Sequence, residues 1–311
     1  MKESIVEDRT IDFFLGCAIW AYKGWLGDFF PRGSAASDFL KLYAQRMTAV
    51  EVNATFYSTP KPETVCRWAA QTPETFQFCP KFPQVVTHSG PLQPHLQTAI
   101  DFMQLMQGLG LRLGPIFAQL PPSYSPQNFS DLASFLKDIH SDVPLALEVR
   151  HPQWFQSPHA EKLNELLTSL QIGRVLLDSR PIYQGSDDPQ AQSQRRKPKL
   201  PLAPTVTAPF TVIRYISHPC WELNDSFLID WAQTLKQRLA QGTRTYFFVH
   251  CPVEAYSPRT AHAFQHLLQD QTAIPELPWD RIVAPPLNSV YFEITNFDSS
   301  SCLITKPICF E

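Results

Sequence analysis

The stretch Leu-Ala-Leu-Glu-Val-Arg at residues 145–150 decides the fold, because it is a short apolar run that ends in charged residues and its pattern recurs along the chain. Helix-like stretches mostly separate these runs. Strands that alternate with helices form a parallel sheet, so the chain is predicted to be an α/β protein. The predicted strands are Phe13–Cys17, Ala49–Asn53, Phe76–Lys81, Ile116–Leu120, Leu145–Arg150, Arg174–Ser179, Thr211–Ile216 and Thr245–His250.

The number and spacing of these strands specify the architecture. Eight strands in about 250 residues match a (β/α)8 barrel. We therefore predict a TIM-like barrel in a single domain over residues 13–270. Residues 271–311 change in character, with several prolines and a β-rich stretch at Ser289–Ile294, and form a C-terminal extension. That extension either packs on the barrel, pairs elsewhere or is disordered.

The segments between strands mostly have one apolar face at helical spacing. They are Asp38–Met47, Pro62–Gln71, His95–Gly108, 128–139, Pro158–Leu170, Asp225–Ala240 and Ser257–Gln269. The connection Pro181–Pro209 lacks such a face, and we predict a long loop after the sixth strand. Its basic run Arg195–Lys199 is interpreted as a solvated loop tip, with phosphate binding as the alternative.

Bulk composition indicates a cytoplasmic protein with one large core. The chain has 311 residues, of which 44% are hydrophobic, and a formal net charge of -3, so it lacks the basic excess of a DNA-coating protein. Its 7 cysteines form no C-x-x-C pair and are predicted to be reduced thiols. Residues 1–11 lack the apolar core of a signal peptide, and no run of about 18 apolar residues predicts a membrane span.

Polar residues at the strand ends mark the candidate site. Side chains two apart on a strand share a face, so Glu51 and Asn53 point together, as do Glu148 and Arg150. Active sites of such barrels lie at the C-terminal ends of the strands, where these residues are predicted to converge. The alternative is a structural ion-pair network that fills the barrel mouth.

Roles follow from the chemistry of these side chains. The carboxylates of Glu51, Glu148 and Asp178 are predicted to be catalytic, as general acid and base. Basic groups would hold an anion, since arginine binds phosphate or carboxylate through two hydrogen bonds. The predicted substrate-binding residues are Asn53, Lys81, Gln119, Arg150, His151, Arg180, Arg214, His250, Trp20, Tyr22 and Trp25. The last three lie in an aromatic first loop, which is either a stacking wall for a ring or a plug on the barrel rim.

Cofactor motifs are lacking in the sequence. It contains no H-E-x-x-H, P-loop or nucleophile-elbow motif, and no cofactor is predicted. The same carboxylates, with His151 and His250, offer the alternative of a divalent metal site.

The motifs at the strand ends resemble one known family. They are Gly16–Trp20, Trp25–Pro31, Val50–Tyr57, Lys81–Pro83, Gln119–Pro122, Glu148–Pro152, Asp178–Pro181 and His250–Pro252. Over roughly residues 13–270 the chain resembles the domain of unknown function 72 family, also called YecE-like. This resemblance implies a TIM-barrel fold and names no reaction. Many members carry an Asn-Asn pair near the eighth strand, where this chain has Val249–Pro252 instead, so a role of that pair does not carry over.

Three functional hypotheses follow. The leading one is an enzyme that acts on a small anionic substrate, such as a phosphorylated sugar. The first alternative is metal-assisted phosphodiester cleavage or nucleic-acid binding, which the negative net charge and the mouth's lysines and arginines disfavour. The second is a non-catalytic binding or scaffold protein. The sequence does not predict the oligomeric state.

Overall fold

The computed structural model describes residues 13–139, 142–193 and 196–282. Its strands are parallel and lie in the order β3-β2-β1-β8-β7-β6-β5-β4 within one sheet. Their bounds are β1 Phe13–Cys17, β2 Ala49–Val52, β3 Gln77–Pro80, β4 Ile116–Gln119, β5 Leu145–Glu148, β6 Gly173–Asp178, β7 Phe210–Ile216 and β8 Arg244–His250. All eight predicted strands are present, although several end one or two residues earlier than predicted.

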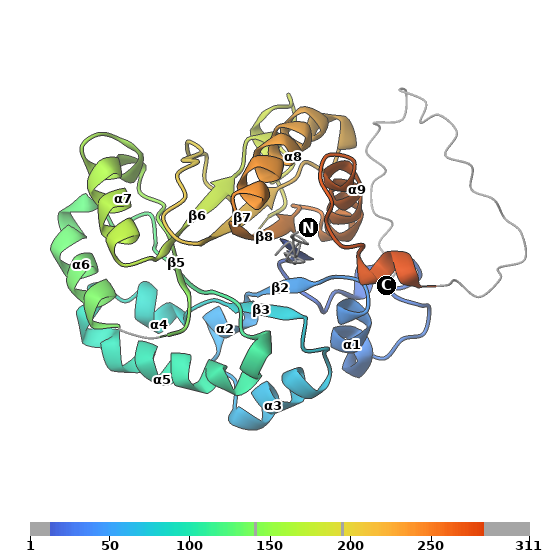
Figure 1. Ribbon diagram of the computed structural model, residues 1–311, viewed down its shortest axis with the longest axis horizontal. Coiled ribbons are helices and arrows are strands. Elements are labelled where there is room, and N and C mark those ends of the chain that lie inside the picture. The colour runs from blue at the N-terminus through green and yellow to red at the C-terminus, as the bar shows by residue number, and fades with distance from the viewer. Residues whose placement is uncertain (1–12, 140–141, 194–195, 283–311) are drawn as a thin grey trace, which may run out of the picture.

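The two outer strands of the sheet meet and nearly close a barrel. Parallel bridges join Phe78 to Leu113 and Lys81 to Phe117, and the Phe82 N–H donates to the Phe117 carbonyl at 3.0 Å. Helices surround the strands in Figure 1. The (β/α)8 prediction is therefore confirmed.

The helices occupy the predicted connections, with two short additions at α2 and α4. The α-helices are α1 Phe39–Ala44, α2 Ala54–Tyr57, α3 Pro62–Ala70, α4 Gln84–Thr87, α5 Leu96–Met106, α6 Phe129–Asp138, α7 His159–Ser169, α8 Asp225–Ala240 and α9 Ser257–Gln269. The 3-10 helices are η1 Lys23–Trp25, η2 Ala36–Asp38, η3 Gln93–His95, η4 Gln107–Arg112, η5 Pro126–Asn128, η6 Pro152–Phe155, η7 Pro181–Tyr183, η8 Trp221–Leu223, η9 Glu254–Tyr256 and η10 Pro278–Arg281.

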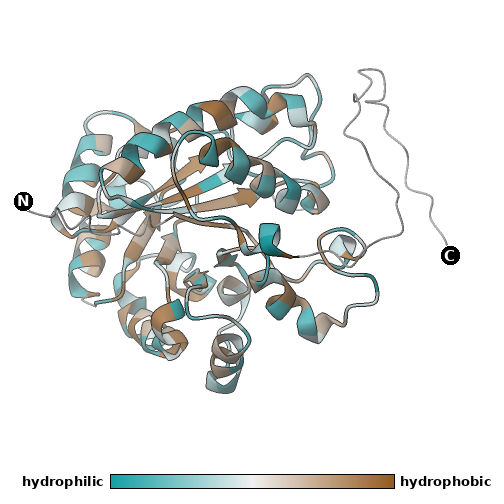
Figure 2. Cartoon of the chain, turned by 45° about the vertical axis from the view of Figure 1, so that its right-hand side comes forward, coloured by the Kyte–Doolittle hydropathy of each residue, from teal (hydrophilic) through white to brown (hydrophobic). Residues whose placement is uncertain are grey.

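Side chains along each strand face alternately into and out of the barrel, which divides the core into two layers. One apolar cluster fills the barrel interior with Ala49, Cys79, Phe117, Ala146, Val175, Phe210, Val212, Tyr246 and Phe248. Their strand neighbours point outward, where they pack against the helices in the larger cluster. Figure 2 shows hydrophobic strands enclosed by helices with mixed polar and apolar faces.

A close approach between β1 and β2 requires a glycine. A Cβ atom on Gly16 would lie 1.8 Å from the Ala49 carbonyl oxygen. The Tyr43 hydroxyl joins the same two strands, since it accepts from the Cys17 N–H at 2.6 Å and donates to the Ala49 carbonyl at 3.1 Å. The first strand therefore tolerates no side chain at this position.

The connection after β6 is a loop, as predicted, because η7 is its only regular element among the described residues of 181–209. The first part of the C-terminal extension packs on α9. The Gln265 side chain donates to the Pro275 carbonyl at 2.8 Å, and the Trp279 ring stacks on His262. The predicted β-rich stretch Ser289–Ile294 lies outside the described residues. No helix in the described ranges is both long enough and apolar enough to cross a membrane.

Candidate functional site at the barrel mouth

A polar layer covers the apolar interior at the C-terminal ends of the strands. Its members follow the interior residues of their strands by two positions, so they face into the barrel as well. They are Glu51, Lys81, Gln119, Glu148, Arg214 and His250, and each is at most 5% exposed. The predicted convergence of these side chains is therefore present in the structure.

Arg214 occupies the centre of this layer. Its Nε and Nη2 donate to the two carboxylate oxygens of Glu51 at 2.7 and 2.8 Å. Its Nη1 donates to Glu148 Oε2 at 2.6 Å. One guanidinium on β7 thus binds carboxylates from β2 and β5, and the planar fork of arginine suits such paired contacts.

Further hydrogen bonds extend the network around the mouth. His250 Nε2 lies 3.0 Å from Glu51 Oε2. On the other side, Arg150 donates through Nε to Glu148 at 2.6 Å and through Nη2 to Gln119 Oε1 at 2.7 Å. Lys81 Nζ donates to the same Gln119 oxygen at 2.7 Å. The ion-pair network proposed as an alternative is present, and it runs through half of the predicted site residues.

The network holds both glutamates in the ionised form. Burial alone would raise the pKa of Glu148, but the charges of Arg214, Arg150 and Lys81 bring it to about 2. Burial opposes ionisation of Glu51 in the same way, but Arg214 and His250 hold its pKa well below the usual range. Burial lowers the pKa of His250 to about 4 despite the charge of Glu51, so the imidazole is neutral at pH 7.

Lys81 is a buried cation in the same layer. Its Nζ lies 4.1 Å from the centre of the Phe56 ring. Burial, together with the nearby charge of Arg214, lowers the pKa of Lys81 to about 7, although Glu148 and Glu51 oppose the shift. This amine therefore titrates near neutral pH.

The long loop brings a second lysine to the mouth. The Lys197 N–H donates to Gln190 Oε1 at 2.6 Å, and its carbonyl accepts from the Tyr183 hydroxyl at 2.6 Å. The Ser179 hydroxyl donates to the Pro198 carbonyl at 2.8 Å. Burial and the charge of Arg214 lower the pKa of Lys197 to about 8, against the opposing effect of Glu51.

The interpretation of residues 195–199 as a solvated loop tip is therefore wrong for Lys197. It holds for Arg196, which is exposed and bound to Asp188 at 2.7 Å. It also holds for Lys199, which is exposed and lies 5.5 Å from the centre of the Tyr183 ring. The loop folds back on the barrel between these two residues and directs one basic side chain inward.

Glu254, at the start of η9, is a second residue that the sequence did not reveal. Its carbonyl accepts from Trp25 Nε1 at 3.0 Å. Its Oε1 is buried and has no hydrogen-bond partner among the described residues. Burial raises the pKa of Glu254 to about 8, against the opposing effects of Ser257 and Lys197 and with a further small increase from Glu51. The side chain is therefore largely protonated at pH 7.

Asp178 does not join this network, which corrects the prediction that it would converge with the other strand ends. Leu177 takes the interior-facing position on β6, so Asp178 points outward toward α8. Its carboxylate accepts from Arg180 at 2.9 and 2.8 Å and from Trp231 Nε1 at 2.8 Å. Because Arg180 is bound to Asp178, its side chain also lies away from the mouth.

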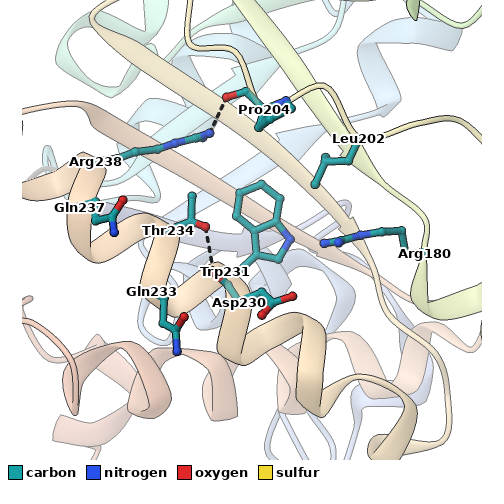
Figure 3. Close-up of a pocket in the computed structure, with 9 residues that line it drawn as sticks. All are labelled: Arg180, Leu202, Pro204, Asp230, Trp231, Gln233, Thr234, Gln237 and Arg238. Atoms are coloured by element: carbon teal, nitrogen blue, oxygen red, sulfur yellow. Dashed lines mark hydrogen bonds between the residues drawn. The ribbon is translucent and has the colours of Figure 1, made fainter.

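Arg180 lies instead at a surface hollow between the long loop and α8, which Figure 3 shows. Its guanidinium lies 4.8 Å from the centre of the Phe227 ring. Across the hollow, Arg238 Nη2 donates to the Pro204 carbonyl at 2.7 Å. The hollow is therefore lined by residues of the long loop and of α8, and it lies outside the barrel.

Two polar residues with predicted binding roles have local partners. Asn53 Nδ2 donates to the Ala18 carbonyl at 3.1 Å. The Nδ1 atom of His151 accepts from the Gln153 N–H at 3.3 Å and caps η6. Within the described residues neither side chain has a hydrogen bond or ion pair with the charged network, so the structure does not bring them into it.

Trp25 is the buried one of the three predicted residues in the aromatic first loop, whereas Trp20 and Tyr22 are only partly buried. Trp25 is 1% exposed and packs against Phe29 and Phe30. Tyr22 meets the Trp25 ring edge-on, and Trp20 meets Trp68 on α3. Because Trp25 is fully covered by protein, it cannot also stack on a ligand.

An eight-stranded parallel barrel with a charged, buried mouth defines the class of protein. The chain matches the family described as Protein of unknown function DUF72 over residues 14–281. It is 33% identical to UPF0759 protein YecE of Escherichia coli over 272 residues, which cover 85% of this chain and 97% of that protein. The chain belongs to the DUF72 family.

Other relatives agree with this assignment. UPF0759 protein YunF of Bacillus subtilis is 29% identical over 156 residues, covering 45% of this chain and 52% of that protein. Crystal structures of DUF72 family proteins share the fold. The protein from Thermotoga maritima has a TM-score of 0.59 at 19% identity, covering 83% of this chain and 99% of that one. The protein from Enterococcus faecalis has a TM-score of 0.59 at 17% identity, covering 83% and 96%.

Replacing Arg214 should destabilise the fold strongly. In Arg214→Met, two buried carboxylates lose their shared partner, and we expect the free energy of unfolding to fall by about 3–5 kcal/mol. Urea unfolding measures this loss. The control is Arg259→Met, which removes an exposed guanidinium bound to Asp28 and should change stability by less than about 1 kcal/mol. Equal losses in the two variants would contradict the central role of Arg214.

His250 should make stability depend on pH. The unfolded chain binds a proton at this residue below about pH 6.5, whereas the folded chain does so only near pH 4. The unfolded state therefore binds more protons between these values, and the free energy of unfolding should fall as the pH is lowered through this window. In His250→Gln the fall should be smaller. The idea fails if urea unfolding gives both proteins the same pH dependence.

Proposed function

We propose that this DUF72 protein is an enzyme that acts on a small anionic substrate, in the first place a phosphorylated metabolite, at the mouth of its barrel. The observation that carries the proposal is an imbalance of charge. Arg150, Arg214, Lys81 and Lys197 gather around only two ionised carboxylates, those of Glu51 and Glu148. An excess of buried positive charge is costly unless an anion compensates it.

The basic groups of the mouth differ in their freedom to bind that anion. Arg214 is fully engaged by the two glutamates. Arg150 is 14% exposed, and Lys197 approaches from the covering loop without a side-chain hydrogen bond among the described residues. Lys81 completes the basic set. Arginine would give paired contacts to a phosphate or carboxylate, and the lysines would add point charges.

Proton transfer would rest on groups other than the predicted carboxylates Glu51, Glu148 and Asp178. With a pKa of about 2, Glu148 remains ionised, as does Glu51, so neither donates a proton at pH 7. Glu254 has a pKa of about 8 and Lys81 one of about 7. The surroundings of Glu148 and Glu254 push the pKa values of these two carboxyls in opposite directions, which indicates separate roles for them. We assign Glu254 as general acid, with Glu51 and Glu148 as fixed acceptors and with Lys81 kept in the basic set that holds the anion.

The alternatives receive less support. A divalent metal at Glu51 and Glu148 would lie against Arg214, whose charge opposes a second cation. A scaffold role would leave the titrating groups near neutral pH unexplained. Nucleic-acid binding remains an outcome of the tests, since a phosphate backbone shares the chemistry of a small anion.

Lys197 should contribute to anion affinity. Sulfate is a suitable probe because it stays doubly charged between about pH 6 and pH 9, where Lys197 and Lys81 titrate. We expect Lys197→Met to bind sulfate roughly tenfold more weakly near pH 7, the effect of one charge-assisted contact. Affinity in the native protein should fall as the pH rises, because the amines lose their protons and Glu254 gains a negative charge. Calorimetric titration measures both effects.

The matched control is Lys199→Met, which removes an exposed lysine from the same loop. It should bind sulfate as the native protein does at every pH. If the native protein and both variants bind sulfate with one affinity, the anion site does not lie at the mouth.

Glu254 should be needed for turnover and not for binding. The amide of Glu254→Gln keeps the size and neutrality of the protonated acid but cannot transfer its proton. With phosphorylated sugars as probes and phosphorus NMR as the readout, we expect conversion by the native protein and by Lys199→Met, and a loss of about 10²–10⁴-fold in Glu254→Gln. Full activity of Glu254→Gln would refute its assignment. Sulfate binding without turnover of any probe would favour a non-catalytic binding protein.

A further inference from the structure

We propose that His262, His266 and Asp280 form a binding site for a divalent transition metal, zinc in the first place, on the outer surface of the barrel. The site is separate from the charged mouth. Among the residues that the structure describes, these three are the one group of His, Cys, Asp or Glu side chains placed to hold a metal ion together.

Two different elements supply the ligands. His262 and His266 are four residues apart on α9, so they lie on the same face of the helix, one turn apart. Asp280 lies in η10, within the C-terminal segment that packs back on this helix. The Trp279 ring stacks on the His262 imidazole, with ring centres 4.3 Å apart, and fixes the orientation of that ring.

The three ligand atoms lie close together, and two of their separations are near those of a coordination shell. His262 Nε2 lies 2.5 Å from Asp280 Oδ1 and 3.1 Å from His266 Nε2. His266 Nε2 lies 3.6 Å from Asp280 Oδ1. A tetrahedral zinc ion with ligands at about 2.0–2.2 Å holds them about 3.3–3.6 Å apart, so the two separations from His266 fit, whereas His262 and Asp280 would move apart by about 1 Å on binding.

Hydrogen bonding alone does not satisfy this arrangement. His262 Nε2 carries either one proton or one lone pair. If it donates to Asp280, it has no lone pair left to accept from His266, so its contacts with Asp280 and His266 conflict by competing for a single proton. A metal ion removes the conflict, because it binds the lone pairs of both neutral imidazoles and the carboxylate at once.

Solvent has access to the remaining coordination position. The side chains of His262, His266 and Asp280 are 30%, 54% and 20% exposed. Two imidazoles and one carboxylate suit zinc better than the hard cations magnesium and calcium. The bound metal would tie residues 278–281 to α9, and a ligand that binds only the folded state raises its stability.

The test uses full-length protein without a polyhistidine tag, since a tag binds zinc itself. After removal of metals with a chelator, the protein is dialysed against zinc and its metal content is determined by mass spectrometry. We expect one zinc ion per chain. Mutation of residues that only hydrogen-bond to metal ligands typically costs about 10–100-fold in metal affinity. Loss of a ligand itself, in His266→Ala or Asp280→Asn, should therefore weaken zinc binding by more than about tenfold.

The matched control is His159→Ala, which removes a partly exposed histidine from α7 and should bind zinc like the native chain. Zinc should also raise the thermal unfolding midpoint of the native protein and of this control, but not of the two ligand variants. Circular dichroism without metal checks that all four proteins are folded. The proposal is overturned if the native protein binds no zinc, or if His266→Ala and Asp280→Asn bind it with native affinity.

Discussion

The double contact of one arginine with two glutamates, all buried within the barrel mouth, is the interaction on which the rest of the site depends. Arg214 joins Glu51 of β2 to Glu148 of β5 across the barrel. An ion pair removed from water recovers its desolvation cost only with good geometry and further hydrogen bonds. Here His250 and Arg150 provide those bonds on either side. The charges are therefore fixed in position by the protein itself.

This fixed layer gives the other polar groups their properties. Lys81 and Lys197 are near enough to Arg214 for its charge to favour their neutral forms, and burial acts in the same direction. Burial raises the pKa of Glu254, and the negative charge of the ionised Glu51 raises it further. Lys81, Lys197 and Glu254, which titrate near pH 7, thus lie around three groups that keep their charge at that pH. These three are Glu51, Glu148 and Arg214. Such a division is common where proteins perform acid and base chemistry at neutral pH.

The period-two pattern of strands explains how much of this site could be predicted from the sequence. Glu51 and Glu148 follow the interior residues Ala49 and Ala146 by two positions, so their direction was available in the alternation. The run that ends in Asp178 has apolar residues on both faces, at Leu176 and Leu177, and its alternation could not show which face the carboxylate takes. The structure gives the interior position to Leu177.

Residues outside the regular elements escaped prediction for a different reason. The direction of Lys197 depends on Tyr183, Gln190 and Ser179, which fold the loop back through hydrogen bonds that no periodicity encodes. Asp280 meets the α9 histidines only because the C-terminal segment reverses direction. Local sequence determines the strands and helices of this chain, whereas the contacts between loops and barrel are long-range and become visible only in three dimensions.

Under the proposed function, the position of Lys197 would link anion binding to proton uptake. An anion in the mouth would favour the charged forms of Lys197 and Lys81 and so raise the pKa of each amine from its value of about 8 or about 7. Binding near neutral pH would then draw protons from solvent, and by linkage a lower pH would strengthen binding. The carboxylates of Glu51 and Glu148 cannot contribute to this exchange, because Arg214 keeps them ionised in both states. Lysines in a desolvated mouth would therefore make the affinity for the proposed anion sensitive to pH, which arginines at the same positions would not do.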